Sequence, residues 1–179
     1  GMIRVAISCE EIWGITDAEV ATVGLPLGYM YGLNTSSSPI LHVGGTIVLM
    51  RRFHPREALD LFTTHRSTLF MGVPTMFTMM MDYCESKGLT YPLPDMRMLI
   101  TAGAPLPPET AARFVASFGK PLSNYYGLSE AFPIFAHHSG ETSPAGSTGR
   151  LAPGAVVEIR RPDGTLCGDD KDGEAFVSG

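Results

Sequence analysis

The chain has 179 residues, of which 44% are hydrophobic, so it can form the core of one domain or of two small ones. Its net charge of −5 and its lack of any Lys- or Arg-rich run argue against nucleic acid as a partner. No apolar stretch reaches the roughly 20 residues of a transmembrane segment. Three widely spaced cysteines fit neither a disulfide framework nor a metal knuckle, so we expect reduced thiols and a cytoplasmic location.

Residues 1–130 alternate apolar, strand-like runs with amphipathic stretches of helix length. Ser8, followed by Glu11 three residues later, has the pattern of a capping box and predicts that a short helix opens there. The predicted strands are 18–27, 46–50, 67–72, 96–101 and 120–127. The other predicted helices are 30–45, 54–66, 74–88 and 107–119. This alternation predicts an α/β fold, with a parallel sheet covered by helices on both faces.

A second pattern begins near residue 134. Gly, Ser, Thr and Pro cluster in 137–149 and predict a loop. Asp163-Gly164 is a hairpin turn signal between two short β-rich runs, 156–159 and 174–179. We therefore expect the sheet to be followed by a small antiparallel β subdomain. The predicted parts are 1–133, an α/β subdomain, and 134–179, a truncated subdomain that resembles part of a β-barrel.

Ligands of an open parallel sheet bind beyond the carboxyl ends of its strands, and two predicted strand ends carry unusual residues. The small residues at 102–105 would let a flat ligand approach the backbone closely. Residues 124–130 combine aromatic rings for a purine, a hydroxyl for a phosphate oxygen and a carboxylate for Mg²⁺. The plain alternative is a tight turn, ordinary core and surface tyrosines, and a helix cap at Ser129 and Glu130. Residue types alone favour that alternative.

A set of motifs in a fixed order favours a ligand site over this plain alternative. The segments are "ITAGAPLPPE" (100–109), "SNYYGLSEA" (123–131), "GSTGRLAPGAVVEI" (146–159) and "DGEAFVSG" (172–179). They resemble successive signatures of the adenylate-forming (AMP-binding) acyl-CoA synthetase superfamily. Two earlier segments, 26–50 and 70–81, also resemble this superfamily. The resemblance covers nearly the whole chain and implies the central part of the N-terminal domain of a larger enzyme, most similar to a fatty acid–CoA ligase.

The resemblance also implies roles for the two strand ends, so that 1–133 becomes an adenylate-binding subdomain. Tyr126 would stack on adenine, Ser129 would meet the α-phosphate, and Glu130 would bind Mg²⁺. Ser129 and Glu130 would thus be the catalytic residues. The cofactor-binding residues implied are Ala102, Gly103, Ala104, Pro105, Asn124, Tyr125, Tyr126, Gly127, Leu128 and Ser129. Within this set, Asn124 and Tyr125 would line the purine edge.

Three positions depart from the family's pattern. Ala102 replaces the first glycine of the usual Gly-Gly-Ala-Pro, and Ser129 replaces threonine while keeping the hydroxyl. Tyr29 stands where many members have a histidine near the acyl carboxylate, which puts the acyl pocket in doubt. The implied pocket residues are Tyr29, Met71, Val73 and Ala102. Their apolar character indicates an apolar or aromatic acid, although core packing is the simpler interpretation for Met71.

The implied reaction activates a fatty or aryl acid with ATP to acyl-AMP, then transfers the acyl group to coenzyme A. ATP or AMP, Mg²⁺ and coenzyme A would be its cofactors and co-substrates. The family's triphosphate loop and lysine-bearing C-terminal domain find no match here, so we expect the chain to need the rest of its parent enzyme and to be inactive alone. A peptide-synthetase adenylation domain that loads a carrier protein and a non-enzymatic nucleotide-binding domain remain alternatives.

Overall fold

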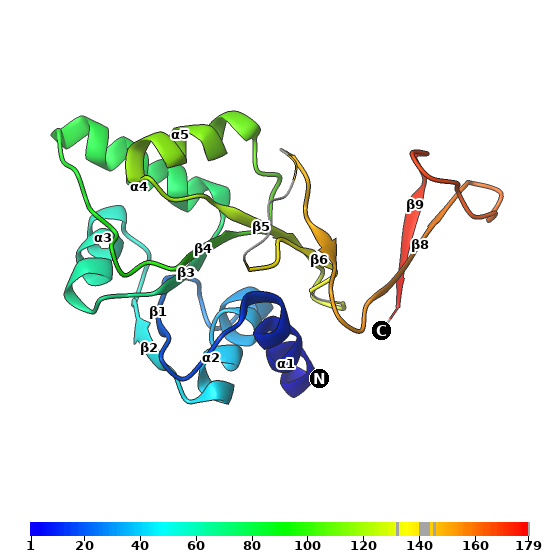
Figure 1. The fold of residues 1–179 in the computed structure, drawn as a ribbon, viewed down its shortest axis with the longest axis horizontal. Coiled ribbons are helices and arrows are strands. Elements are labelled where there is room, and N and C mark those ends of the chain that lie inside the picture. The colour runs from blue at the N-terminus through cyan, green and yellow to red at the C-terminus, as the bar shows by residue number, and fades with distance from the viewer. Residues whose placement is uncertain (132, 140–143, 145, 179) are drawn as a thin grey trace.

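A seven-stranded sheet organises the chain in the computed structural model, which describes residues 1–131, 133–139, 144 and 146–178. The strands are β1 (Val20–Val23), β2 (Thr46–Leu49), β3 (Leu69–Gly72), β4 (Met98–Thr101), β5 (Ser123–Tyr126), β6 (Phe135–Ala136) and β7 (Arg150–Leu151). Their order is β2-β1-β3-β4-β5-β6-β7. Pairing is parallel from β2 through β5 and antiparallel from β5 to β7. The predicted α/β class and its parallel sheet are confirmed (Figure 1).

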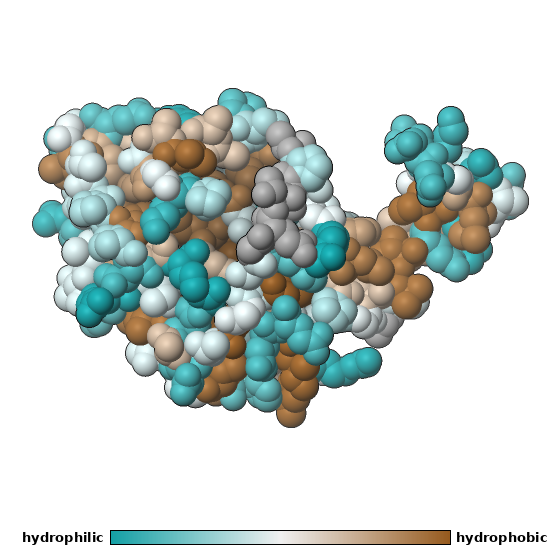
Figure 2. Space-filling view, in the orientation of Figure 1, coloured by the Kyte–Doolittle hydropathy of each residue, from teal (hydrophilic) through white to brown (hydrophobic). Residues whose placement is uncertain are grey.

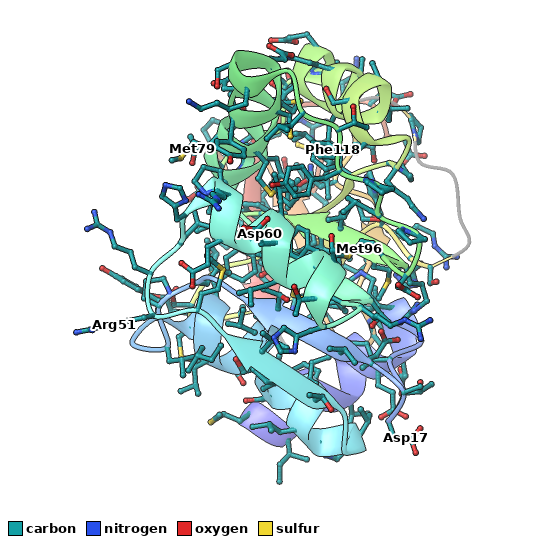
Figure 3. The ribbon with its side chains drawn as sticks, turned by 90° about the vertical axis from the view of Figure 1, so that its left-hand side faces the viewer. Asp17, Arg51, Asp60, Met79, Met96 and Phe118 are labelled. Atoms are coloured by element: carbon teal, nitrogen blue, oxygen red, sulfur yellow. The ribbon has the colours of Figure 1, made fainter. Side chains whose placement is uncertain are left out.

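Helices cover both faces of this sheet, as predicted. The helices are α1 (Met2–Trp13), α2 (Ser38–Val43), α3 (Pro55–Thr64), α4 (Pro74–Lys87) and α5 (Pro108–Phe118). Figure 3 shows Asp60 on α3, Met79 on α4 and Phe118 at the end of α5. Proline occupies the first turn of these three helices. Left-handed Gly88 and Gly119 end α4 and α5, because glycine adopts positive φ without strain.

Two hydrophobic cores result from the alternation of side chains along the strands. Leu69 and Met71 of β3 pack with α1 and α2. Phe70, between them in sequence, packs instead with α3, α4 and α5. Successive strand residues point to opposite faces, so a strand covered on both sides is apolar at most of its positions. This explains the continuous apolar runs in the sequence.

The first helix begins earlier than predicted. α1 starts at Met2, so the prediction of a capping box at Ser8 and Glu11 is wrong. Ser8 lies in mid-helix, is buried, and donates its hydroxyl to the carbonyl of Pro153 at 3.4 Å. A serine whose side chain finds a tertiary partner has no need to cap its own helix.

The predicted helix over 30–45 is divided. A π-helical turn, η1 (Tyr31–Thr35), is followed by the separate helix α2, which ends at the left-handed Gly44. The break coincides with Ser36 and Ser37, and Pro39 stands in the first turn of α2. Proline there supplies no backbone N–H for the preceding turn.

The predicted antiparallel piece is present as the hairpin of β8 (Val156–Arg160) and β9 (Glu174–Ser178). This hairpin forms its own two-stranded sheet and extends away from the main body (Figure 1). β6 and β7, by contrast, continue the large sheet beyond β5. A domain boundary at 133/134 stays a prediction. Within the predicted loop 137–149, residues 140–143 and 145 lie outside the described residues.

An ion pair between the buried Glu19 and the partly exposed Arg97 links the amino ends of the strands to α1. The carboxylate of Glu19, which is 3% exposed, accepts hydrogen bonds from Arg97 and from the hydroxyl of Thr68. Arg97 also donates to the carbonyls of Trp13 at 2.9 Å and Gly14 at 3.3 Å. The network lies at the opposite end of the strands from the carboxyl-end loops. It holds the carboxyl end of α1 against the sheet.

Candidate functional site

The two strand ends singled out in the sequence lie side by side. β4 and β5 are parallel neighbours, with Ile100 opposite Ser123 and Thr101 opposite Asn124. The loops that follow them therefore leave the same edge of the sheet. The chain after β1 also reaches this edge, because β1, β3, β4 and β5 all run in one direction. Ligands of open parallel sheets bind at this edge.

The loop after β4 brings backbone close to its neighbours. Ala102 is buried, and Gly103 has a φ of +82°, where side chains are strained. A Cβ atom at Gly103 would lie 3.4 Å from Cγ1 of Val73. Ala104 and Pro105 are exposed. The small side chains of this loop thus leave space for a ligand beside the sheet edge.

Ser129 and Glu130 lie in a tight turn after β5. Leu128 and Ala131 exchange backbone hydrogen bonds of 2.9 and 3.2 Å, which close the turn. Both side chains between them are exposed. The alternative of a helix cap at these residues is excluded, because no helix follows within the described residues from 127 to 131. The hydroxyl and the carboxylate are presented to the outside of the sheet edge.

The adjacent tyrosines of β5 point in opposite directions, as successive strand residues do. Tyr125 is 6% exposed and packs edge-to-face against Trp13 and Tyr31, with ring centroids 5.6 and 5.5 Å apart. Tyr126 is 43% exposed. Burial raises the pKa of both Tyr125 and Tyr31. Both phenols therefore stay protonated at neutral pH, and the hydroxyl of Tyr31 donates to the carbonyl of Gly72 at 3.0 Å.

The turn η1 lies beside this site, after the end of β1. Hydrogen bonds from three serines stabilise the turn. The hydroxyls of Ser36, Ser37 and Ser38 each donate to the carbonyl five residues earlier, at 2.9, 2.7 and 3.0 Å. Gly32 is required in the turn, because a Cβ there would lie 2.3 Å from the carbonyl oxygen of Pro26. Single π-helical turns occur frequently at functional sites.

Two adjoining cavities open at this edge. The larger, of about 330 Å³, is lined by Gly1, Met2, Arg4, Val5, Ser8, Met30, Asn34, Ser129, Glu130, Ala131, Pro133, Ile134, Pro153, Gly154, Ala155, Val177 and Ser178. The smaller, of about 170 Å³, is lined by Met30, Tyr31, Thr35, Ala102, Gly103, Tyr125, Gly127, Leu128 and Ser129. Met30 and Ser129 line both, so the cavities meet between these residues.

The structure brings together only part of the predicted site. The smaller cavity contains Ala102, Gly103, Tyr125, Gly127, Leu128 and Ser129, and the larger contains Ser129 and Glu130. The other predicted residues are absent from both linings. Of these, Tyr29 is 71% exposed, Met71 is a fully buried core residue, and Val73 is half-buried at the end of β3. Asn124 is buried.

Sequence reasoning missed the residues that η1 contributes. Tyr31, Asn34 and Thr35 of η1 and Met30 just before it all line a cavity, although only Tyr29 in the segment 29–35 was singled out. The serine run at 36–38 was a usable signal, because consecutive serines compete for backbone hydrogen bonds and disfavour a regular helix.

Glu130 stands without a cluster of other metal ligands. Among residues 1–131, 133–139, 144 and 146–178, no group of three or more His, Cys, Asp or Glu side chains is arranged to hold a metal ion. A single carboxylate still fits Mg²⁺, which usually keeps several waters and is held by one or two carboxylates plus substrate phosphates. The residues present therefore fit a magnesium ion that arrives with a nucleotide.

The sequence profile of AMP-binding enzymes matches residues 1–179, the whole chain. The chain belongs to the AMP-binding enzyme family. It is 34% identical over 157 residues to indoleacetate–CoA ligase of Aromatoleum aromaticum, covering 87% of this chain and 30% of that protein. It is 30% identical over 159 residues to a long-chain-fatty-acid–CoA ligase of Bacillus subtilis, covering 87% and 28%.

A solved structure has the same fold. ATP-bound MatB from Rhodopseudomonas palustris superposes with a TM-score of 0.88 and 25% identity, over 99% of this chain and 35% of that one. The chain thus spans about a third of the length of the relatives it matches. The described part of the chain contains no helix long and apolar enough to cross a membrane. Its cytoplasmic location stays a prediction.

Proposed function

We propose that the full-length protein is an AMP-forming acid–CoA ligase. The observation that carries this proposal is the meeting of the β4 and β5 loops at two adjoining cavities, with Ser129 shared between them and Glu130 in the larger one. One cavity can hold an acid and the other the phosphate end of a nucleotide. Relatives named as CoA ligases for aryl and fatty acids support the reaction class.

The proposed chemistry joins the acid to the nucleotide and then releases it. A carboxylate oxygen of the acid attacks the α-phosphorus of ATP, pyrophosphate leaves, and acyl-AMP forms. The thiol of coenzyme A then attacks the acyl carbon, gives up its proton, and displaces AMP. Ser129 would donate to an α-phosphate oxygen, and Glu130 would hold Mg²⁺, which offsets negative charge on the phosphates. Tyr126, exposed beside this turn, would stack on adenine.

The smaller cavity favours an aryl acid over a long-chain fatty acid. None of its lining residues carries a charge, and two are aromatic. Its volume is about 170 Å³, and a dry apolar cavity of about 150 Å³ is large enough for one benzene ring. A single aromatic ring therefore matches this space, with Ala102 and Gly103 leaving room along one wall.

The test uses the full-length enzyme, Mg²⁺-ATP and a panel of acids: benzoate, 4-coumarate, indoleacetate, palmitate and malonate. We expect acid-dependent pyrophosphate release, fastest with an aryl acid, and thioester formation when coenzyme A is added. The present chain alone should release none, because it matches only 30% and 28% of the length of the two CoA ligases compared above. Absence of acid-dependent pyrophosphate release from the full-length protein across the panel would overturn the proposal. Release without thioester formation from coenzyme A would point to a carrier protein as acceptor.

A further inference from the structure

Trp13 is a fully buried aromatic residue that is anchored at two points. It is the last residue of α1 and is 1% exposed. Its indole N–H donates to the carbonyl of His137 at 3.1 Å, and its own backbone carbonyl accepts from Arg97 at 2.9 Å. Buried polar groups whose hydrogen bonds are all made hold a side chain in one orientation. The indole is therefore fixed both by its ring nitrogen and by its backbone.

The anchored indole packs against Tyr125 of β5. The two ring centroids lie 5.6 Å apart at an interplanar angle of 67°, which is an edge-to-face contact. Tyr31 makes a second edge-to-face contact with Tyr125 at 5.5 Å, and its hydroxyl is bonded to the carbonyl of Gly72. Tyr125 thus packs against two rings that each have a hydrogen bond of their own.

The contact supports a wall of the smaller cavity from outside. Tyr125 and Tyr31 line that cavity, whereas Trp13 lines neither of the two cavities. The indole therefore contacts Tyr125 without reaching the ligand space. Because core side chains are closely packed, the Tyr125 ring cannot move back while the indole occupies its place. The width of the smaller cavity then depends on a residue that no ligand touches.

We propose that Trp13 is a positioning residue that determines which acids the enzyme accepts, because it keeps the Tyr125 ring from withdrawing out of the smaller cavity. With the indole in place, the cavity keeps the size of a single aromatic ring. Without the indole, Tyr125 can turn into the vacated space, and a longer acid gains room. The inference rests on the function proposed above and deepens it, since it names a determinant of acid size outside the cavity.

The test replaces Trp13 by leucine in the full-length enzyme. Acid-dependent pyrophosphate release gives kcat/KM for benzoate and for the longer 4-coumarate, and it also gives the KM of ATP. We expect the ratio of the two kcat/KM values, benzoate over 4-coumarate, to fall by about 10- to 100-fold, the scale on which apolar pockets distinguish ligands by size. The KM of ATP should stay at its wild-type value, because Trp13 does not line the cavity of Ser129 and Glu130.

Trp13→Phe is the conservative variant. It keeps an aromatic ring against Tyr125 and loses the indole N–H and part of the volume. This variant should retain most of the benzoate preference that Trp13→Leu loses. A preference as low as that of Trp13→Leu would overturn the inference, because the ring contact would then have no part in holding Tyr125.

Phe114→Leu is the matched control for the loss of core packing. Phe114 is fully buried, packs edge-to-face with Phe77 at 5.3 Å, and belongs to the core on the other face of the sheet from Tyr125. Both leucine variants should lower Tm in thermal unfolding, yet Phe114→Leu should keep the wild-type preference between the two acids. An equal fall in preference in both would overturn the inference, because it would follow from destabilising either core.

Two further outcomes separate the inference from the function on which it rests. A wild-type preference in Trp13→Leu would overturn the positioning role and leave the ligase function intact. A wild-type enzyme that releases no pyrophosphate with either acid would instead overturn the aryl-acid function proposed above. If Trp13→Leu does not fold, Trp13→Met replaces it, because methionine fills irregular space without a ring, and an unchanged preference in that variant overturns the inference.

Discussion

Among single residues, Glu130 has the most specific proposed role. It is the exposed carboxylate in the larger cavity, next to the Ser129 hydroxyl and in a turn closed by backbone hydrogen bonds. The turn holds the carboxylate outward without using it as a structural partner. Substitution of Glu130 should therefore lower the rate of the adenylation step and leave the free energy of unfolding unchanged.

Glu130→Ala in the full-length enzyme should lower kcat for pyrophosphate release by about 100-fold or more, the scale of losing one charge contact in a transition state. Added Mg²⁺ should restore little of this loss. Glu109→Ala, which removes an exposed carboxylate from the first turn of α5, should keep wild-type kcat. Equal kcat in Glu130→Ala and wild type would remove Glu130 from the metal role.

Arg97 is the residue whose loss should most affect stability without touching the cavities. Arg97→Ala leaves the Glu19 carboxylate buried without its charge partner. We expect the unfolding free energy to fall by about 3 kcal/mol, the lower end of the range for buried pairs, because Arg97 is partly exposed. Arg56→Ala is the control, because the Arg56–Asp60 pair is a surface i,i+4 pair at 3.4 Å and contributes at most about 0.5 kcal/mol. Urea unfolding of each variant measures the difference; equal losses would contradict the assigned role of the Glu19 network.

At the scale of an element, η1 shows how a local conformation depends on a backbone contact. Gly32→Ala would place a Cβ 2.3 Å from a backbone oxygen that cannot move aside. We expect a loss of at least about 2 kcal/mol in unfolding free energy, together with weaker ligand binding because Asn34 and Thr35, which line the two cavities, are displaced. Urea unfolding and calorimetry measure the two effects.

Gly28→Ala is the matched control in the same connection. A Cβ at Gly28 meets nothing within 4 Å, and its φ is not in the left-handed region. The substitution should be neutral or stabilise by up to about 1 kcal/mol, because alanine restricts the unfolded chain. Similar destabilisation by both substitutions would show that the whole connection, rather than the contact at Gly32, requires glycine.

For the whole molecule, the contrast lies between the sheet and the terminal hairpin. The sheet has a core on each face, whereas β8 and β9 pair only with each other. Figure 2 shows hydrophobic surface on the hairpin and on its connection to the main body. Val156, Leu166 and Phe176 are 55%, 58% and 47% exposed. An isolated two-stranded hairpin is marginal in water, so this part should open far more easily than the sheet.

Hydrogen exchange of the present chain measures that contrast. Backbone amides of β8 and β9 should exchange orders of magnitude faster than those of β3 and β4, because hairpin opening breaks few buried contacts. Amides of the exposed helix ends serve as an internal reference for fast exchange. Protection of β8 and β9 equal to that of β3 and β4 would mean that the hairpin packs against the main body in solution.

Much of the fold could be predicted because its signals are local. The apolar runs of β3 and β4, the prolines that open α3, α4 and α5, and the glycines that end α4 and α5 all act within a few residues. Ser8 misled the prediction because its hydroxyl bonds to Pro153, 145 residues away. The prediction of one long helix over 30–45 was wrong, because contacts to Pro26 and the hydrogen bonds of the serine run determine the path of η1.

The sequence by itself determined the class of the fold, the family resemblance and the strand-end residues such as Gly103, Ser129 and Glu130. These depend on residue type and order along the chain. Only the tertiary structure decided which side chains share a cavity. Adjacent Tyr125 and Tyr126 separate because a strand alternates its faces, while Asn34 and Ser129, 95 positions apart by their numbers, meet because parallel strands end at one edge.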